Sequence, residues 1–364
     1  MAQFSCIQAS IRNIESWDRI MEDKKYCMSA FLMYRSILNE NKTFKEGITP
    51  YLYHIPFKRE GIHSSQQLKT ALQRQMEEYT KDGKAALALS GGIDSAVLAK
   101  FMPKGSVAYT FKCVVPGIEV VDESQAAAKF AKECGLEHRI VEIYWEDIEK
   151  FGAKLMLHKG APMHSIEIQI YKAALEAKKD GFTKLIFGES ADVSYGGFSQ
   201  LLSKDWKVGE FIERYSYVLP WQVLKEPELV LEPIFKHEKN GYIDVHGFTS
   251  DIFFHEAMGT YTNACNAAGI ELVAPYANTY LAESLDMVRI RNGENKYIIR
   301  DIFKSLYKDF LVPEKLPMPR PVNEWFKNWE GPKRPEFWQH CVEGLTGDQK
   351  WLVYALEKFL DLIY

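Results

Sequence analysis

Several features that mark secreted, membrane or metal-clustered proteins are missing from this sequence. Its 364 residues include six scattered cysteines with no CxxC pair. A disulfide framework or a structural zinc site is therefore not expected, and a reducing compartment fits this cysteine usage. No apolar run approaches the ~18 residues of a membrane span, and MAQFSCIQAS lacks the basic and apolar regions of a secretion signal. We expect a cytoplasmic protein without a membrane partner.

A strong net charge is also missing. Lys and Arg number 45 against 49 Asp and Glu, which gives a formal net charge of -4. No broad basic field therefore argues for nucleic acid, and we expect no nucleic-acid partner. The hydrophobic fraction of 46% and the charged fraction of 26% are ordinary for a soluble globular chain. The length allows two domains, or one large domain with an appendage.

What stands out is the stretch AALALSGGIDSAVLAK at residues 85–100. It begins with an apolar run of the size of a buried strand, passes through two glycines and continues as an apolar helical pattern. The first N–H groups of a helix have no intrahelical partner, and the helix dipole favours an anion there. Because no lysine follows the glycines, this is not a GxxxxGK[ST] loop. The stretch predicts a phosphate-binding turn of another kind.

Strand and helix patterns alternate through the first two thirds of the chain. Strands are predicted at 85–89, 107–115, 139–144 and 185–187, and helices at 63–79, 122–134 and 166–179. This alternation favours an α/β fold with a doubly wound parallel sheet and helices on both faces. Ligands of such sheets bind beyond the carboxyl ends of the strands. We therefore expect the segments 90–95 and 188–197 to face one cleft.

The second part of the chain is richer in aromatic residues and alternates less. Helices are predicted over 251–268 and 295–310, and an amphipathic helix ends the chain. Four prolines between 313 and 321 predict a loop. On the helix at 295–310, Lys296 and Arg300 are four residues apart, so they share a face that either meets phosphate or is simply solvated. The histidines at 237, 246 and 255 suit no standard metal site.

Six segments in collinear order resemble the synthetase domain of the asparagine synthetases, which belong to the ATP pyrophosphatase (PP-loop) superfamily together with β-lactam synthetases. SGGIDS at 90–95 resembles their nucleotide loop, and GESADVSYGGF at 188–198 resembles their GEGxDExFGGY segment. The other four are TFKC at 110–113, Asp122-Glu123, GIELVAPYAN at 269–278 and NKYIIR at 295–300. The resemblance covers about residues 65–325.

This resemblance implies an architecture. The sheet would be of the adenine nucleotide α-hydrolase type, with a mostly helical C-terminal part and a small N-terminal extension. We expect an N-terminal extension at 1–80, an asparagine-synthetase-like ATP pyrophosphatase domain at 81–330 and a helical tail at 331–364.

The resemblance also implies a chemistry that uses ATP and Mg²⁺. A substrate carboxylate is adenylated with release of pyrophosphate, and ammonia or an amine then forms an amide and releases AMP. By resemblance, Asp94 and Asp192 hold the metal, and Glu189 takes the proton of the amine. Lys296 and Arg300 neutralise phosphate charge. The residues expected to bind the nucleotide are Ser90, Gly91, Gly92, Asp94, Ser95, Thr110, Phe111, Gly188 and Arg300.

The sequence departs from the family at several positions. The family's glutaminase uses a cysteine after the initiator methionine, and here Ala2 stands there, so we expect no glutaminase of its own. The family's loop lysine has no clear counterpart in PEKLPMPRPVNEWF, where Lys315 and Arg320 are the candidates and Arg320 is our predicted catalytic cation. Val193 and Val273 replace a carboxylate and an arginine of the family pattern.

These departures leave the substrate acid open. The predicted partners are a small-molecule carboxylate and an ammonia or amine donor that a partner glutaminase could supply, and a homo-oligomer stays open. Two other functions remain as alternatives. One is a nitrogen or sulfur transferase that adenylates a carbonyl oxygen, for which Cys113 would need a partner. The other is a non-catalytic nucleotide-binding homologue.

Overall fold

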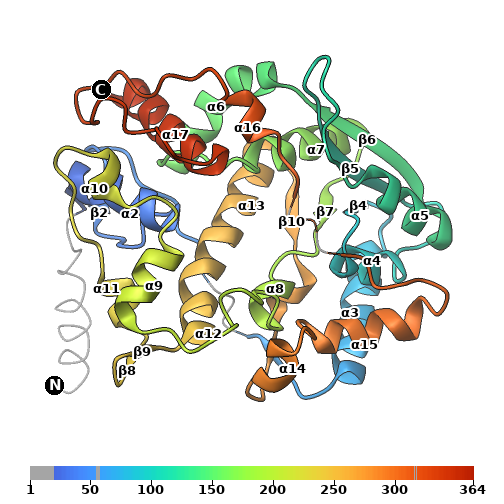
Figure 1. Cartoon of the computed structure of the whole chain (residues 1–364). Helices are drawn as coiled ribbons and strands as arrows, with labels where there is room; N and C mark the ends of the chain where they lie inside the picture. Colours follow the sequence, from blue (N-terminus) through green and yellow to red (C-terminus); the bar gives the residue numbers. More distant parts are fainter. Residues whose placement is uncertain (1–19, 55–57, 315, 317) are drawn as a thin grey trace, which may run out of the picture.

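A parallel sheet lies at the centre of the computed structural model, which describes residues 20–54, 58–314, 316 and 318–364. Its five strands run in the order β10-β7-β4-β5-β6, and every neighbouring pair is parallel (Figure 1). The strands are β4 (Ala85–Ala88), β5 (Val107–Cys113), β6 (Glu137–Ile143), β7 (Lys184–Ile186) and β10 (Glu271–Val273). The predicted α/β parallel sheet is confirmed, although the edge strand β10 was not predicted.

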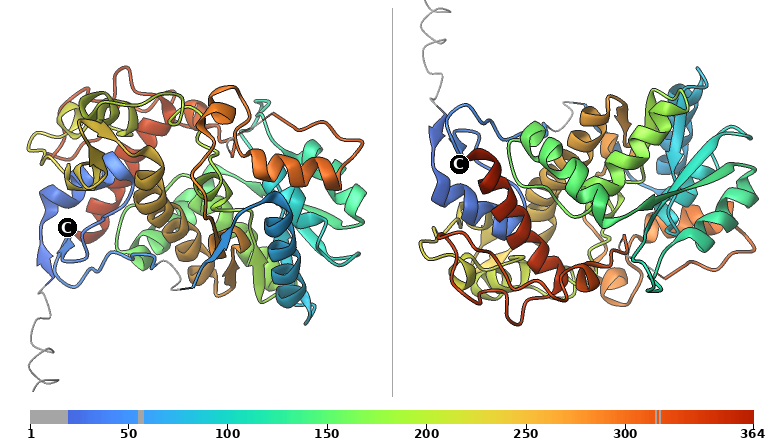
Figure 2. Two further views of the ribbon diagram at one scale, coloured as in Figure 1. Left: turned by 90° about the horizontal axis from the view of Figure 1, so that it is seen from below. Right: turned by 90° about the horizontal axis from the view of Figure 1, so that it is seen from above.

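Helices cover both faces of this sheet, as Figure 2 shows. One layer contains α3 (Ser65–Thr80), α4 (Ile93–Ala99), α5 (Ser124–Cys134) and α15 (Tyr297–Leu306). The other contains α6 (Trp145–Lys159), α7 (Glu167–Lys179) and α13 (Phe254–Ala268). The sheet is therefore doubly wound, as predicted.

The strand order reverses direction beside β4. From β4 the chain proceeds to β5 and β6 on one side, whereas β7 and β10 lie on the other side. Ligands of open α/β sheets bind outside the carboxyl ends of strands at such a switch point. The segments that follow β4 and β7 are 90–95 and 188–197, so the topology brings them to the same edge.

Most predicted helix ends agree with the structure within two residues, and two differ for local reasons. Ser64 caps α3 by accepting a hydrogen bond from the Gln67 N–H. A π-helical turn at Thr249–Phe253 precedes α13. The helix predicted at 295–310 is shorter at both ends: Lys296 takes a left-handed conformation with φ of 53° and α15 begins at the next residue, and it ends at Leu306.

The first and last helices of the described residues pack against one another. Helix α2 (Lys24–Tyr34) was not predicted. It is almost wholly buried, because its own apolar side chains lie on all sides of the helix instead of forming one stripe. Helix α17 (Gly347–Ile363) packs on α2 and α6, and the Tyr364 hydroxyl donates a hydrogen bond to the Phe44 carbonyl (Figure 1). One hydrophobic core contains side chains from both ends and from the sheet. The domain boundaries near 80 and 330 stay predictions.

Shorter elements complete the described chain. The helices are α8 (Ala191–Ser194), α9 (Val208–Tyr215), α10 (Pro220–Val223), α11 (Glu232–Phe235), α12 (Val245–Phe248), α14 (Met287–Arg291), α16 (Val322–Trp325) and a 3₁₀ turn at Pro275–Asn278. Three two-stranded pairs join β1 (Met21–Glu22) to β2 (Lys42–Thr43), β3 (Glu60–Ile62) to β11 (Thr279–Leu281) and β8 (Glu238–Lys239) to β9 (Tyr242–Ile243).

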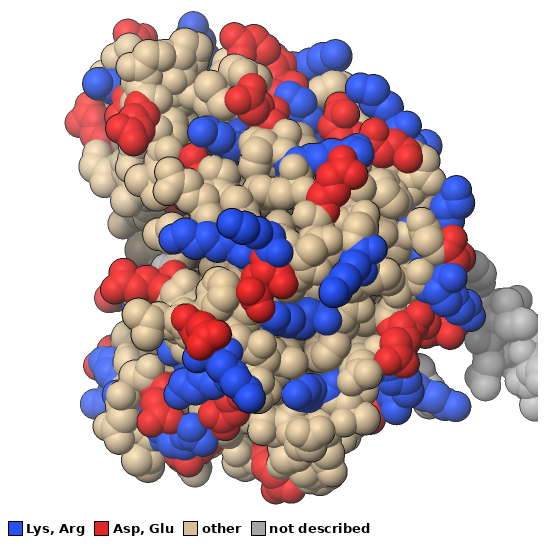
Figure 3. Space-filling model, turned by 90° about the vertical axis from the view of Figure 1, so that its right-hand side faces the viewer, with Lys and Arg blue, Asp and Glu red and all other residues tan. Residues whose placement is uncertain are grey.

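The surface agrees with the balanced composition. Basic and acidic side chains are interspersed on the face shown in Figure 3. Among the helices of the described residues, none is long and apolar enough to cross a membrane.

Candidate active site

A cavity of about 390 Å³ opens at the switch point of the sheet. Its wall includes the turn after β4, the segment after β7 and the start of α15. Every predicted site residue except Gly91 lines it, namely Ser90, Gly92, Asp94, Ser95, Thr110, Phe111, Gly188, Glu189, Asp192, Lys296, Arg300 and Arg320. The structure thus brings together residues that lie up to 230 positions apart, from Ser90 to Arg320. Their roles stay predictions.

Lys296 lies between two carboxylates. Its Nζ is 2.6 Å from Asp94 Oδ2 and 3.0 Å from Asp192 Oδ1. Burial by itself lowers the pKa of Lys296, but Asp192 and Asp94 more than offset this effect and the pKa is raised above its usual value. With a side chain only 6% exposed, Lys296 does not belong to a solvated helix face, and that reading is wrong.

This arrangement bears on the predicted metal. Both carboxylates reach the same ammonium, so they also converge on a position that a cation can share. Mg²⁺ in nucleotide sites commonly uses one or two carboxylates together with phosphate oxygens and water. No group of three metal-binding side chains occurs within the described part of the chain. The two aspartates therefore fit a magnesium ion that also binds phosphate, and they do not form an all-protein cage.

Two glycines give Asp192 and the β4 turn their positions. A Cβ atom on Gly197 would lie 1.8 Å from Asp192 Oδ1, so any side chain there would displace the carboxylate. A Cβ atom on Gly188 would lie 3.0 Å from the backbone nitrogen of Ser95. The segment after β7 therefore packs directly on the start of α4. Glycine is needed at 188 for the two segments to approach, and at 197 for Asp192 to keep its position.

The phosphate turn is ordered by its own hydroxyl groups. Ser90 Oγ lies 2.9 Å from Ser95 Oγ and accepts a hydrogen bond from the Gly92 N–H at 3.1 Å. Next to it, the Thr110 hydroxyl donates to the Leu89 carbonyl at 2.6 Å. These bonds hold the turn in place at the start of α4, where backbone N–H groups favour an anion.

Glu189 has an environment suited to proton transfer. Burial raises its pKa to about 7, and the Asp192 charge adds to this effect, whereas hydrogen bonds from the Ser190 N–H and from Tyr261 oppose it. The Ser190 N–H donates to Glu189 Oε1 at 2.7 Å. A carboxylate with such a pKa is half-ionised near neutral pH and can accept a proton there.

Comparison of the sequence with known protein families identifies the domain that contains most of this site. The sequence model of the asparagine synthase family matches residues 64–244. The chain contains an asparagine synthase domain. That match includes Asp94, Glu189 and Asp192, whereas Lys296 and Arg320 lie beyond it. A search of curated proteins finds no match.

Among solved structures, the chain is similar to an NH3-dependent NAD synthetase from Campylobacter jejuni, with 16% identity over 37% of this chain and 61% of that chain and a TM-score of 0.26. It thus spans less than two thirds of that synthetase. An NMN synthetase from Francisella tularensis has 12% identity over 70% of this chain and 100% of that chain, with a TM-score of 0.26.

A predicted subunit of a tRNA methyltransferase from Methanocaldococcus jannaschii has 14% identity over 61% of this chain and 86% of that chain, with a TM-score of 0.23. At TM-scores this low, the fold assignment rests on the sheet order and the asparagine synthase match, and not on these three chains.

Around the asparagine synthase domain, two arginines close the cavity. The Arg300 guanidinium is held by the carbonyl and the side chain of Asn295, at 2.7 and 2.8 Å. Arg320 donates to the Met318 carbonyl at 2.7 Å and to Asp348 of α17 at 2.9 Å. Arg320 therefore reaches the cavity from the predicted proline-rich loop at 313–321, whereas Lys315 lies outside the described residues.

Sequence reasoning missed several lining residues. Glu123, at the start of α5, has a pKa of about 7 because burial raises it, although the Gly91 N–H lowers it by hydrogen bonding. Arg35, His164 and Glu256 form a second polar group on the cavity wall. Of these, only Glu123 had a signal in the sequence, as part of the acidic pair of the asparagine synthase pattern.

The structure also bears on the other candidate sites. His237 and His255 both face Asp251, at 3.0 and 3.8 Å, and the described residues form no metal-binding group there. Cys113 is buried, which raises the pKa of its thiol to about 12, and Gln169 is 3.2 Å from its sulfur. A thiol so rarely ionised is a poor nucleophile, which weighs against a sulfur-transfer role.

Proposed function

We propose that this chain is an ATP-dependent amide-forming ligase that adenylates a substrate carboxylate and transfers the acyl group to ammonia or an amine. The observation that supports this most is the convergence of Asp94, Asp192 and Lys296 beside the glycine turn of an asparagine synthase domain. This arrangement provides charge for a triphosphate at one edge of the sheet. The acid and the amine are small molecules, and the site of action is the cytoplasm.

In the first step, a carboxylate oxygen attacks the α-phosphorus of ATP. An acyl–phosphate bond forms, the bond between the α-phosphorus and the bridging oxygen breaks, and pyrophosphate leaves with its charge. Backbone N–H groups of the turn, Lys296 and Arg300 stabilise the charge that develops on the phosphates. A magnesium ion held by Asp94 and Asp192 would supply further neutralisation of the pyrophosphate.

In the second step, the amine nitrogen attacks the acyl carbon and AMP leaves with the oxygen that joined it to the acyl group. The nitrogen must lose a proton, and Glu189 accepts it, because its pKa of about 7 leaves much of it ionised at neutral pH. Arg320 supplies a cation on the same wall and stabilises the departing AMP. The donor is free ammonia, an amine, or ammonia from a partner glutaminase.

ATP–pyrophosphate exchange with a panel of carboxylic acids tests this proposal. Exchange that depends on one class of acid is expected in the wild type, and Asp192→Asn should abolish it. Asp301→Asn is the matched control, because Asp301 is exposed on α15 and does not line the cavity. ATP binding without exchange for any acid, in the presence of magnesium, would favour the non-catalytic alternative and refute the ligase.

A further inference from the structure

Three aromatic side chains line the cavity beside the charged residues of the proposed ligase site. They are Phe198, Tyr217 and Phe253, and each is half-buried. The rings of Phe198 and Phe253 meet edge to face, with their centres 4.6 Å apart. Phe198 directly follows the paired glycines at 196–197, so the segment that carries Asp192 also carries this ring. These three residues form an aromatic wall that the proposed chemistry does not use.

One face of α13 extends the aromatic wall. Phe253, Ala257 and Tyr261 are four residues apart, so they lie on the same face of the helix, and all three line the cavity. Phe253 is the last residue of the π-helical turn Thr249–Phe253, a local departure from the α-helix that is frequent at functional sites. The next residue of this face, Ala257, has only a methyl group. The face therefore leaves space beside the Phe253 ring.

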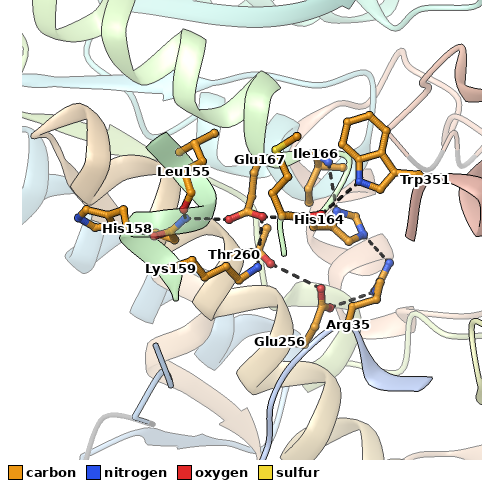
Figure 4. A network of polar contacts seen from close by, with 12 residues as sticks. Arg35, Leu155, His158, Lys159, His164, Ile166, Glu167, Glu256, Thr260 and Trp351 are labelled. Carbon is orange, nitrogen blue, oxygen red and sulfur yellow. Dashed lines mark hydrogen bonds and ion pairs between the residues drawn. The ribbon is translucent and has the colours of Figure 1, made fainter. Parts of the chain in front are cut away.

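The charged residues next to the aromatic wall neutralise one another (Figure 4). Arg35 donates from Nη2 to Glu256 Oε2 at 2.9 Å, and its Nη1 lies 2.5 Å from His164 Nε2. Burial, followed by the charge of Arg35, lowers the pKa of His164 well below its usual value, so His164 is neutral. Nε of Arg35 has no hydrogen-bond partner among the described residues, but it is buried and is not presented to a ligand. The ion pair of Arg35 and Glu256 therefore brings no net charge to the cavity.

Aromatic rings cover much of this ion pair. The guanidinium carbon of Arg35 lies 3.8 Å from the centre of the Tyr217 ring and 5.7 Å from the centre of the Phe253 ring, both within the range of a cation–π contact. The side chains of Arg35 and Glu256 are only 13% and 4% exposed. Burial raises the pKa of Tyr217 to about 12, so its hydroxyl stays protonated. The surface that this part of the cavity offers to a ligand is therefore that of uncharged rings.

A buried network holds the ion pair in place. Glu167 is fully buried and accepts a hydrogen bond from the His164 N–H at 2.5 Å. Trp351 of α17 donates to the carbonyl of Met163 at 3.2 Å, one residue before His164. Figure 4 shows how these contacts connect α7 and α17 to the ion pair. The wall is therefore preorganised at this point.

Glu189 lies between the metal-binding aspartates and the aromatic wall. Besides burial, the charges of Asp192 and Glu256 both raise the pKa of Glu189, so both carboxylates lie near it, and Tyr261 forms a hydrogen bond with it. In the proposed reaction, the acid is adenylated beside Asp192 and its acyl carbon meets the amine beside Glu189. The rest of the acid then has the aromatic wall as its surroundings.

We propose that the acid used by this protein is a monocarboxylic acid with an uncharged, apolar body of about the size of an aromatic ring, which packs on Phe198, Tyr217 and Phe253. This inference rests on the proposed function, because it names the substrate class of the same site. An apolar body gains free energy when these rings remove it from water, and an aromatic body also packs edge to face on them. A second charged group would be buried here without a partner, because Arg35 is already paired with Glu256.

Calorimetric titration with three carboxylates tests the inference. The protein is loaded with magnesium and α,β-methylene-ATP, in which carbon replaces the bridging oxygen of the bond that the reaction breaks. The probes are 3-phenylpropionate, which has a ring, butyrate, which is a small apolar acid, and glutarate, which carries a second carboxylate. We expect 3-phenylpropionate to bind at least about tenfold more tightly than either of the others. Equal affinities, tighter binding of glutarate, or no binding of 3-phenylpropionate would overturn the inference.

Variants of Phe253 make the test specific. Phe253→Ala should weaken binding of 3-phenylpropionate about ten- to hundredfold and narrow its advantage over butyrate, whereas the affinity for α,β-methylene-ATP should stay the same. Phe235→Ala is the matched control, because Phe235 is 53% exposed on α11 and does not line the cavity. Unaltered 3-phenylpropionate affinity in Phe253→Ala, or an equal loss of nucleotide affinity, would contradict the assignment.

Two further measurements keep the outcomes separate. If Phe253→Ala does not fold, Phe253→Leu keeps an apolar side chain, and loss of the contact between rings should still lower 3-phenylpropionate affinity severalfold. Binding of 3-phenylpropionate that depends on Phe253, without pyrophosphate exchange for any acid, would refute the proposed function and leave the assignment of the aromatic wall standing. Exchange that is equally fast with 3-phenylpropionate, butyrate and glutarate would support the ligase and overturn the apolar acid.

Discussion

Replacing Lys296 with methionine tests the central charge arrangement directly. The ammonium is 2.6 Å from Asp94 and 3.0 Å from Asp192, and its side chain is 6% exposed. Removing one partner of a buried ion pair costs about 3–5 kcal/mol. The aspartates are 19% and 27% exposed, so water screens part of their repulsion. We therefore expect a loss of about 2–4 kcal/mol in the free energy of unfolding.

For a chain of 364 residues, that loss corresponds to a melting midpoint lower by about 3–5 °C. Millimolar MgCl₂ should restore more stability to Lys296→Met than to the wild type, because the metal then meets two carboxylates without a competing ammonium. Calorimetric melting with and without magnesium measures both effects, and Lys304→Met serves as the control, because Lys304 is exposed on α15 and does not line the cavity. Midpoints within about 1 °C of this control, or the same magnesium shift in all three proteins, would refute the reasoning.

Three further predictions concern the other wall residues. Glu189→Gln should lower kcat about 10²- to 10⁴-fold. The wild-type rate should rise with pH through about 7 and then level off, because the ionised Glu189 is the base. A rate that falls with pH would exclude this role. The pKa of Glu123 is raised from 4.5 to about 7 in the folded state, so the folded protein binds more protons than the unfolded chain between these pH values. The stability that Glu123 contributes should therefore be lost as the pH rises from about 4.5 to 7. Glu123→Gln should reduce this pH dependence of the unfolding free energy in denaturant titrations. Gly197→Ala should displace Asp192 and lower the free energy of unfolding by about 1–3 kcal/mol. Gly209→Ala is the control, because its Cβ would meet nothing within 4 Å, and it should be neutral or slightly stabilising in the same melts. Equal effects of the two changes would show that the Asp192 contact is unimportant.

The sequence predicted most of what local chemistry determines. The parallel sheet, the glycine turn and the segment at 188–197 follow from periodicity, from paired glycines and from their order along the chain. What it could not predict depends on tertiary contacts. Lys296 was predicted to contact phosphate, but the sequence does not show that the fold brings Asp94 and Asp192, 202 and 104 residues away, to its amine.

Arg35 illustrates the same limit more strongly. Nothing near it in the sequence marks a residue that lines the cavity, and the surrounding apolar run is typical only of a buried segment. Its partners are His164, just before α7, and Glu256, on α13. They lie 129 and 221 residues further along the chain. The three-residue edge strand β10 was not predicted, although the equally short β7 was.

The contact between the chain ends has a consequence for synthesis in the cell. Tyr364 reaches Glu22 across 342 residues, and Lys24 reaches Glu336 across 312. Helix α2, which ends at Tyr34, therefore acquires its contacts with α17 only after residues 347–363 have been synthesised. Contacts this distant in sequence form slowly, so the side of α2 that packs on α17 stays uncovered until then, although β2 and α10 are available to α2 earlier. Transiently exposed apolar surface favours aggregation, so this delay is a stage at which the folding chain is vulnerable.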